Sequence, residues 1–148
     1  MYKKISVVPV LQVAGAYVAK DCVGALLTFP VSTGALKNWA TIKRLTVIDA
    51  AVQSEPMSLH LFTASPAAAA RTDADECVQV AADLAKKIVT LPIANADFAA
   101  FAGDSIASYE LNTAIVFDGL NIYGVLECSA TPDYVAVDDL TINLILEI

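Results

Sequence analysis

The 148-residue sequence is poor in the residues that carry catalysis and cofactor binding. It has one histidine, and its three cysteines include no C-x-x-C pair, which disfavours a zinc ribbon or a dithiol redox centre. Neither G-x-S-x-G nor a phosphate-binding glycine loop is present, so hydrolase and nucleotide-binding functions lack support. No apolar run reaches the roughly 18 residues of a membrane helix. We therefore expect no enzyme, no cofactor and no membrane partner.

The few residues that could act in catalysis or bind a metal lack partner residues at the spacing that those functions need. His60 has no nucleophile or orienting group at a recognisable distance along the chain, so we expect a surface or interface histidine. Carboxylates at 73–76 (DADE) and 133–139 are oxygen ligands of the kind that calcium takes. The DADE run lacks the glycine and the later ligands of an EF-hand loop. We expect solvated loop carboxylates and no metal.

The three cysteines, Cys22, Cys77 and Cys128, are odd in number and widely separated. Such cysteines are typical of buried free thiols in a protein made in a reducing cytosol. We therefore predict no disulfide.

Charge is unevenly distributed along the chain. Residues 1–50 contain six Lys and Arg against two acidic residues, whereas residues 51–148 contain three against fourteen. The net charge of −7 disfavours nucleic-acid binding, which needs clustered Lys and Arg. The basic N-terminal third is instead suited to an acidic partner surface.

Short alternating segments dominate the pattern. The clearest is LTINLILEI (140–148), in which Leu140, Ile142, Leu144 and Leu146 fall on one face of a period-two repeat. Similar segments predict strands at 5–13, 22–31, 41–49, 57–63, 88–93, 105–111, 114–117, 121–129 and 140–148. One or two helical turns are expected near 78–87 and 95–101, with turns at 32–34 and 118–119. Pro9 and Gln12 interrupt the apolar start, which favours a first strand over a signal peptide.

This list of about nine short strands predicts one all-β domain over residues 1–148, an antiparallel β-sandwich that is jelly-roll-like. The short link between 41–49 and 57–63 favours an antiparallel hairpin. Alternation within 41–49 places Lys43 and Arg44 on opposite faces of the strand. Trp39, just ahead of that strand, either packs over the end of the sheet or anchors an interface, since Trp and Arg are common in binding hot spots.

Three stretches carry a family resemblance. They contain LHLF (59–62), DLAK (83–86) with IANADF (93–98), and NIYGVLECSATPDY (121–134) with DDLTINL (138–144). In this order and spacing they resemble small tailed-bacteriophage virion proteins encoded near capsid genes. Ile122 and Thr131 depart from the family pattern, and the N-terminal third has no counterpart in it.

The resemblance implies a head decoration or cement protein, assembled in the host cytoplasm onto the exterior of the capsid. Its implied partners are the major capsid protein and other copies of itself, as a homotrimer. The family has no catalytic residues to carry over. The alternative is a free-standing jelly-roll module that binds a ligand such as carbohydrate. The candidate capsid or subunit contacts are Tyr2, Lys3, Lys4, Trp39, Lys43 and Arg44.

Overall fold

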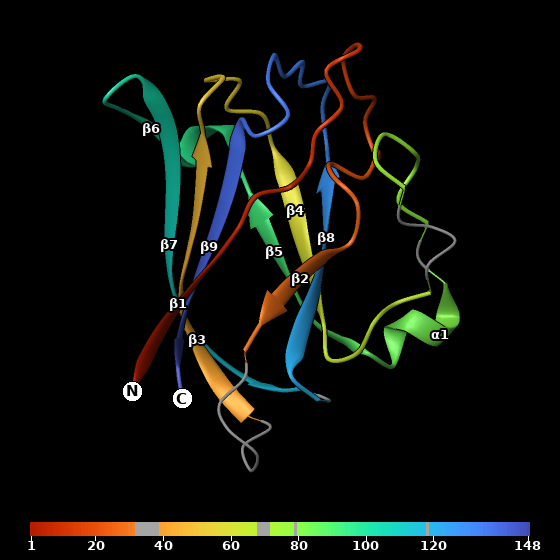
Figure 1. Ribbon diagram of the computed structural model, residues 1–148, viewed down its shortest axis with the longest axis vertical. Helices are drawn as coiled ribbons and strands as arrows, with labels where there is room; N and C mark the ends of the chain where they lie inside the picture. The colour runs from red at the N-terminus through yellow and green to blue at the C-terminus, as the bar shows by residue number, and fades with distance from the viewer. Residues whose placement is uncertain (32–38, 68–71, 79, 118) are drawn as a thin grey trace.

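Two antiparallel sheets face each other across one apolar core (Figure 1). The computed structural model describes residues 1–31, 39–67, 72–78, 80–117 and 119–148. The strands are β1 (Tyr2–Val7), β2 (Leu27–Pro30), β3 (Trp39–Asp49), β4 (Met57–Phe62), β5 (Lys87–Ile93), β6 (Phe98–Phe101), β7 (Asp104–Val116), β8 (Asn121–Cys128) and β9 (Leu140–Glu147). A four-residue helix α1 (Ala81–Leu84) and a 3₁₀ turn η2 (Asn95–Asp97) complete the described elements. The all-β sandwich predicted from the sequence is confirmed.

The strand order is that of a jelly roll. One sheet runs β1-β9-β3-β7-β6 and the other runs β2-β8-β4-β5. The chain crosses between the sheets after every strand except at the β4–β5 and β6–β7 connections. Two sheets of four strands wound in this way form a jelly roll, to which β6 adds a short fifth strand at one edge.

β9 is an interior strand of the larger sheet, and its alternating pattern predicts its half-buried faces correctly. It pairs with β1 on one side and β3 on the other. Leu140, Ile142, Leu144 and Leu146 are each fully buried between the sheets. Burying each such side chain is worth about 1.5–3 kcal/mol, so this strand contributes much of the apolar stabilisation of the core.

The predicted hairpin between 41–49 and 57–63 is wrong, because β3 and β4 belong to different sheets. The connection after β3 crosses the end of the sandwich, held by the buried carboxylate of Asp49. That carboxylate accepts hydrogen bonds from the Ala51 and Ser54 amides at 3.0 and 2.8 Å. Burial raises the pKa of Asp49 above its ordinary value, against the opposing effect of these amides.

The predicted strands 105–111 and 114–117 are one continuous strand, β7, which pairs with β3 along its length. The predicted turn at 32–34 and Asp118 of the turn at 118–119 lie outside the described residues. The predicted turn near 78–87 contains α1, whereas the one near 95–101 is limited to η2, because Phe98–Phe101 forms β6.

The prediction that Lys43 and Arg44 lie on opposite faces is wrong. The register of β3 shifts between Ile42 and Arg44 against both β7 and β9. Ile42 and Leu45 are buried on the two sides of this irregularity, so the in–out alternation is displaced by one residue. A bulge redirects side chains in this way. Lys43 and Arg44 therefore both lie on the outer face of the sheet.

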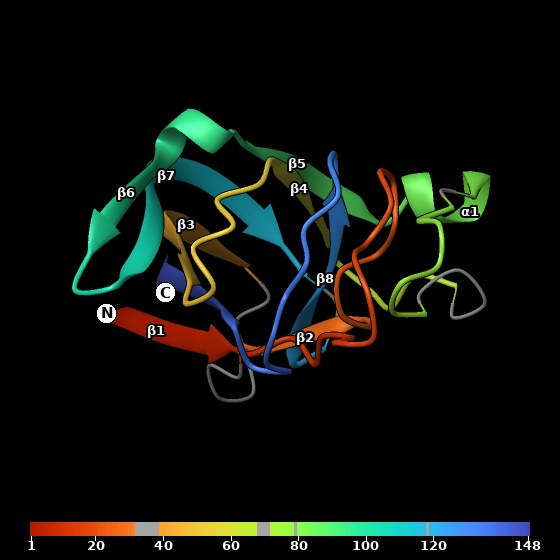
Figure 2. The same ribbon diagram turned by 90° about the horizontal axis from the view of Figure 1, so that it is seen from above.

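The described parts of the long connection between β4 and β5 (63–67, 72–78 and 80–86) cover part of the outer face of the four-stranded sheet. They contain α1 and lie on the side of that sheet away from the larger sheet (Figure 2). Beneath them, Phe62 and Val125 form a second apolar cluster with Cys22 and Cys77. The outer face of one sheet is thus partly packed by the protein's own chain.

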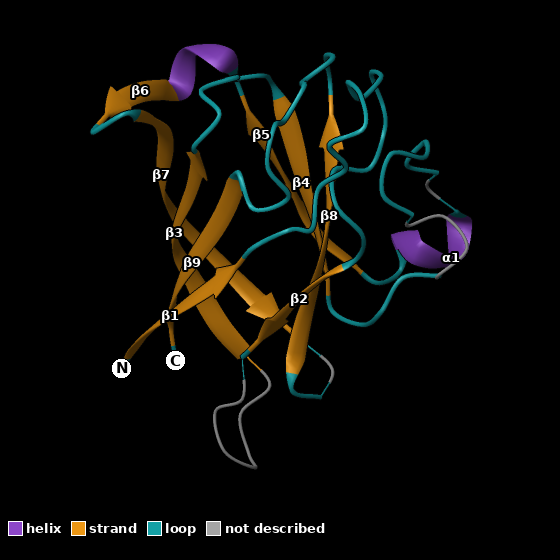
Figure 3. Ribbon diagram, turned by 45° about the horizontal axis from the view of Figure 1, so that its top comes forward, coloured by secondary structure: helices purple, strands orange, loops and turns teal. Residues whose placement is uncertain are grey.

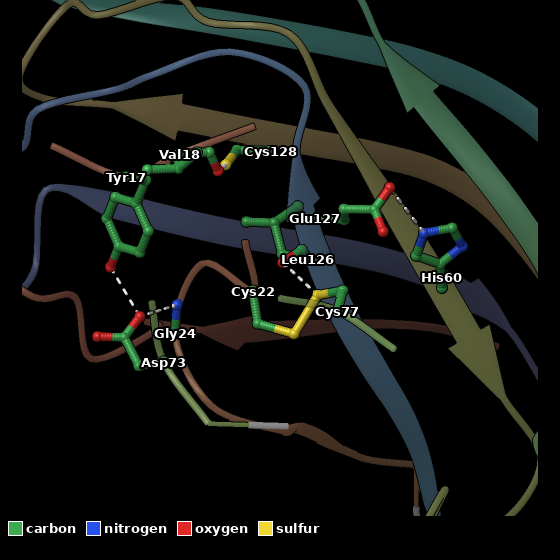
Figure 4. The surroundings of a disulfide bond; sticks show 10 residues. All are labelled: Tyr17, Val18, Cys22, Gly24, His60, Asp73, Cys77, Leu126, Glu127 and Cys128. Atoms are coloured by element: carbon green, nitrogen blue, oxygen red, sulfur yellow. Dashed lines mark hydrogen bonds and ion pairs between the residues drawn. A yellow bond between two sulfur atoms is a disulfide. The ribbon is translucent and has the colours of Figure 1, made fainter. Parts of the chain in front are cut away.

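The prediction of three free thiols is wrong for two of them. Cys22 and Cys77 form a disulfide, while Cys128 is free and buried (Figure 4). The two cysteines are 55 residues apart in sequence. They meet because the segment around Asp75 pairs with the segment around Cys22 through backbone hydrogen bonds, including Cys22 N–H to Asp75 O and Cys77 N–H to Lys20 O, each 2.8 Å.

Candidate contact surface

The outer face of the five-stranded sheet carries most of the contact residues predicted from the sequence. Trp39, Lys43 and Arg44 project from β3, and Tyr2 and Lys4 project from β1. The strand registers align Lys4 with Ile145, Ile145 with Arg44, and Arg44 with Glu110 in one row across the sheet. Five of the six predicted residues therefore share one face.

Lys3 lies apart from the other five. Its neighbour in the alternation is the buried Ile5, and its ammonium group donates to the carbonyls of Pro30 and Val31 at 3.1 and 2.9 Å. These bonds connect β1 to the end of β2 in the other sheet. Lys3 therefore helps to hold the two edges together.

A shallow groove of about 660 Å³ opens on this face where the bulge lies. Its lining combines an aromatic ring, paired charges and two aliphatic side chains. The lining residues are Tyr2, Lys43, Arg44, Glu110, Leu111, Asn112 and Ile145.

The charges in the groove are balanced by ion pairs. Lys43 Nζ lies 2.8 Å from Glu147 Oε2 and 2.9 Å from Asn112 Oδ1, while Arg44 Nη2 lies 2.8 Å from Glu110 Oε1. The pairing raises the pKa of Lys43 and lowers the pKa of Glu147. All four charged side chains remain partly or largely exposed, so each pair is weak and open to exchange with a partner's charges.

Sequence reasoning missed Glu110, Asn112, Ile145 and Glu147 as members of this surface. Alternation alone would have placed Glu110 and Glu147 on the outward faces of their strands. It could not bring them beside Lys43 and Arg44, because strand order and register depend on long-range pairing. Asn112 was missed because it falls in the gap between two predicted strands that are in fact one.

Trp39 begins β3 on the same outer face, opposite Val116 of β7. Its side chain is 52% exposed, and Val116 is 58% exposed. The tryptophan thus extends the surface toward the end of the sheet where the two termini lie (Figure 1).

The residues considered above for catalysis or metal binding instead make contacts that hold the fold together. His60 is 7% exposed on the outer face of the four-stranded sheet, so the expectation of a surface or interface histidine is wrong. Its Nδ1 lies 3.0 Å from Thr90 Oγ1, and its Nε2 lies 3.9 Å from Glu127 Oε1 (Figure 4). Burial raises the pKa of Glu127.

Two of the acidic loop residues are hydrogen-bonded rather than solvated, contrary to the sequence prediction. Asp73 Oδ1 accepts bonds from the Tyr17 hydroxyl and the Gly24 amide, both at 2.7 Å (Figure 4). Asp139 is buried and accepts bonds from the amides of Val135 and Ala136. Within the described ranges, no group of three His, Cys, Asp or Glu residues is placed to hold a metal ion.

In the described part of the chain, no helix has the length and apolar character needed to cross a membrane. Comparison with protein-family models gives no match. A search of curated proteins likewise gives no significant match.

Proposed function

We propose that this chain is a non-enzymatic structural protein of a bacteriophage virion, a decoration or cement protein that binds the major capsid protein on the exterior of the head. The family resemblance of residues 42–147 supports the virion assignment. A symmetric homo-oligomer, a trimer, is the proposed state on the shell. Many weak contacts repeated over one shell give strong attachment, because multivalency raises avidity without strong single contacts.

The observation that carries the proposal is the difference between the two outer faces. The outer face of the four-stranded sheet is partly covered by the described parts of the connection between β4 and β5. The five-stranded sheet instead presents Tyr2, Lys4, Trp39 and the Lys43–Arg44 pair to solvent. A rigid sandwich with one open face suits binding to a flat protein surface. The exposed ion pairs can exchange partners at low energetic cost.

The test is salt-dependent attachment to heads. Lys4→Gln/Arg44→Gln removes two positive charges from the open face and should release the protein from heads at lower salt than the wild type. The matched control, Lys20→Gln/Lys87→Gln, removes the same charge from outside this face. Co-sedimentation with heads measures both. Equal retention of the two variants at every salt concentration would remove the proposal that this face contacts the shell.

The groove favours one alternative function, a jelly-roll module that binds carbohydrate. Balanced charges beside Tyr2 and Asn112 offer both hydrogen-bond donors and acceptors to an uncharged polyhydroxylated ligand. Two results together would favour this function over the virion protein. The chain would be a monomer that does not sediment with heads, and a polysaccharide gel would retard its migration unless Tyr2→Ala is introduced.

A further inference from the structure

The hairpin of β6 and β7 projects from one end of the sandwich and leaves β6 at the edge of the larger sheet (Figure 3). β6 pairs with β7 from Phe98 opposite Ala107 to Phe101 opposite Asp104. The turn between them uses Ala102 and Gly103, with φ of 53° and 97°, as a tight two-residue hairpin requires. On its other side, β6 pairs with no strand among the described residues, and its first amide, that of Phe98, donates to the carbonyl of Asn95 in the adjoining turn.

The other edge strands carry the features that discourage pairing with a second chain. β1 has Lys3 and Lys4, β2 ends in Pro30, and β5 contains Lys87 and Pro92. Lysine and proline on an edge are common protections against unwanted strand addition.

The part of β7 that β6 leaves uncovered is protected in another way. It carries Glu110, and the register shift opposite Ile42 and Arg44 interrupts its regular pairing. By contrast, residues 98–103 contain no charge and no proline.

An apolar strip on the outer face adjoins this edge. The strand registers align Ala99 with Ile106 and Ile106 with Ile48, and Phe101 lies next to Ala99 on the same face. Phe101 is 69% exposed, and Ile106 and Ile48 are half-buried. This strip is apolar, with the carboxylate of Asp104 beside Phe101 at its tip, whereas the groove end carries the ion pairs.

We propose that β6 pairs antiparallel with β6 of a second copy of this chain, so that the two five-stranded sheets become continuous across a two-fold axis. A two-fold axis perpendicular to the sheet keeps outward residues on one side, and a register centred on Ala100 satisfies this condition. Phe101 then lies opposite the partner copy's Ala99, and Ala100 lies opposite its own copy.

This register is self-complementary in size. The large side chain of Phe101 meets the small Ala99, as close packing across facing positions requires. No charged residue of the strand lies opposite another, so like-charge repulsion between directly paired positions is avoided. The hairpin of β6 and β7 lies at one side of the molecule (Figure 2). Isologous contacts of this kind close without forming fibres.

The two-fold contact goes beyond the proposed function, because it requires neither a capsid nor the open groove. It is also compatible with a three-fold contact elsewhere on the chain. If trimers form with the two-fold axes crossing the three-fold axis, β6 pairing joins them in twos. Loss of the pairing halves the particle mass in either case.

The test uses opposite charges placed at the axis. Ala100→Lys and Ala100→Glu each put like charges opposite one another, and each should halve the mass measured by sedimentation equilibrium. An equal mixture of the two variants should regain the wild-type mass, because lysine then faces glutamate. The same exchange at Ala114 of β7, Ala114→Lys, lies on the exposed outer face away from β6 and should leave the mass unchanged.

The mixing experiment separates loss of pairing from loss of folding, since two misfolded chains would not restore one another. A wild type with the same mass as Ala100→Lys, or a mixture that does not reassociate, would overturn the proposal. Head attachment of Ala100→Lys reports on the proposed function separately, because the residue lies outside the groove.

Discussion

Asp73 shows how one carboxylate can organise a loop that the sequence presents as merely acidic. It joins the hydroxyl of Tyr17, which is 1% exposed, to the amide of Gly24. Burial and then the bond to Asp73 raise the pKa of Tyr17, so its hydroxyl remains a donor throughout the physiological range. Gly24 adopts a φ of +74°, and a Cβ there would meet Pro9 Cβ at 2.7 Å. Both the backbone conformation and the lack of space for a side chain therefore require glycine at position 24.

We predict that Asp73→Ala lowers the free energy of unfolding by about 3 kcal/mol, because it leaves two buried donors without a charged acceptor. Urea denaturation measures the change. The neighbouring Asp75→Ala removes an exposed carboxylate and should change stability by no more than about 0.5 kcal/mol. Equal effects of the two substitutions would contradict a structural role for Asp73.

Cys128 provides a second prediction at this scale. Burial raises the pKa of its thiol to about 11, and its Sγ donates to the Val18 carbonyl at 3.0 Å. At pH 8 only about one thiol in a thousand is then ionised, and the thiolate is the reactive form. Iodoacetamide should leave the native protein unmodified and add one label in urea, as counted by mass spectrometry. Rapid labelling of the native protein would contradict the burial of this thiol.

At the scale of elements, the disulfide fastens the connection between β4 and β5 to the sheet that it partly covers. A cross-link between residues 55 apart removes chain entropy from the unfolded state worth about 4 kcal/mol. We predict that Cys22→Ser/Cys77→Ser lowers the free energy of unfolding by about that amount. A reducing agent should weaken the wild type similarly and leave the double variant unchanged. Three reactive thiols in unreduced, denatured wild type would contradict the bond.

Alternation along the chain was sufficient to predict most of the strands, because side-chain burial in a sheet has a period of two, but it missed β6, where a helical turn was predicted. β9 is the clearest correct case, and β4 and β8 lie within about two residues of their predicted bounds. Pairing was not predictable in the same way. The hairpin of β3 with β4 failed because a short connection can also cross a sandwich. The Lys43 bulge and the disulfide likewise depend on contacts between segments distant in sequence.

At the scale of the whole molecule, the candidate surface was predictable in its residues but not in its shape. The sequence predicted contact residues in the basic N-terminal third, among them Tyr2, Lys4, Lys43 and Arg44. Their meeting on one face depends on the adjacency of β1, β9 and β3. The acids that balance the groove, Glu110 and Glu147, come from β7 and β9, whose positions no local pattern encodes.

The two sheets give the molecule an asymmetry that the proposed function uses. One outer face is partly covered by the chain itself, and the other combines a groove of ion pairs with an apolar strip beside β6. On a head, the first face would point outward and the second would meet the shell, with neighbouring copies joined through β6.

Electron cryomicroscopy of heads prepared with and without this chain tests the central claim most directly. We expect additional density on the exterior of the heads that carry the chain, fitted by the jelly roll with its five-stranded sheet against the shell. Heads that look the same with and without it, or a chain bound with the sheet face turned away from the shell, would contradict the account.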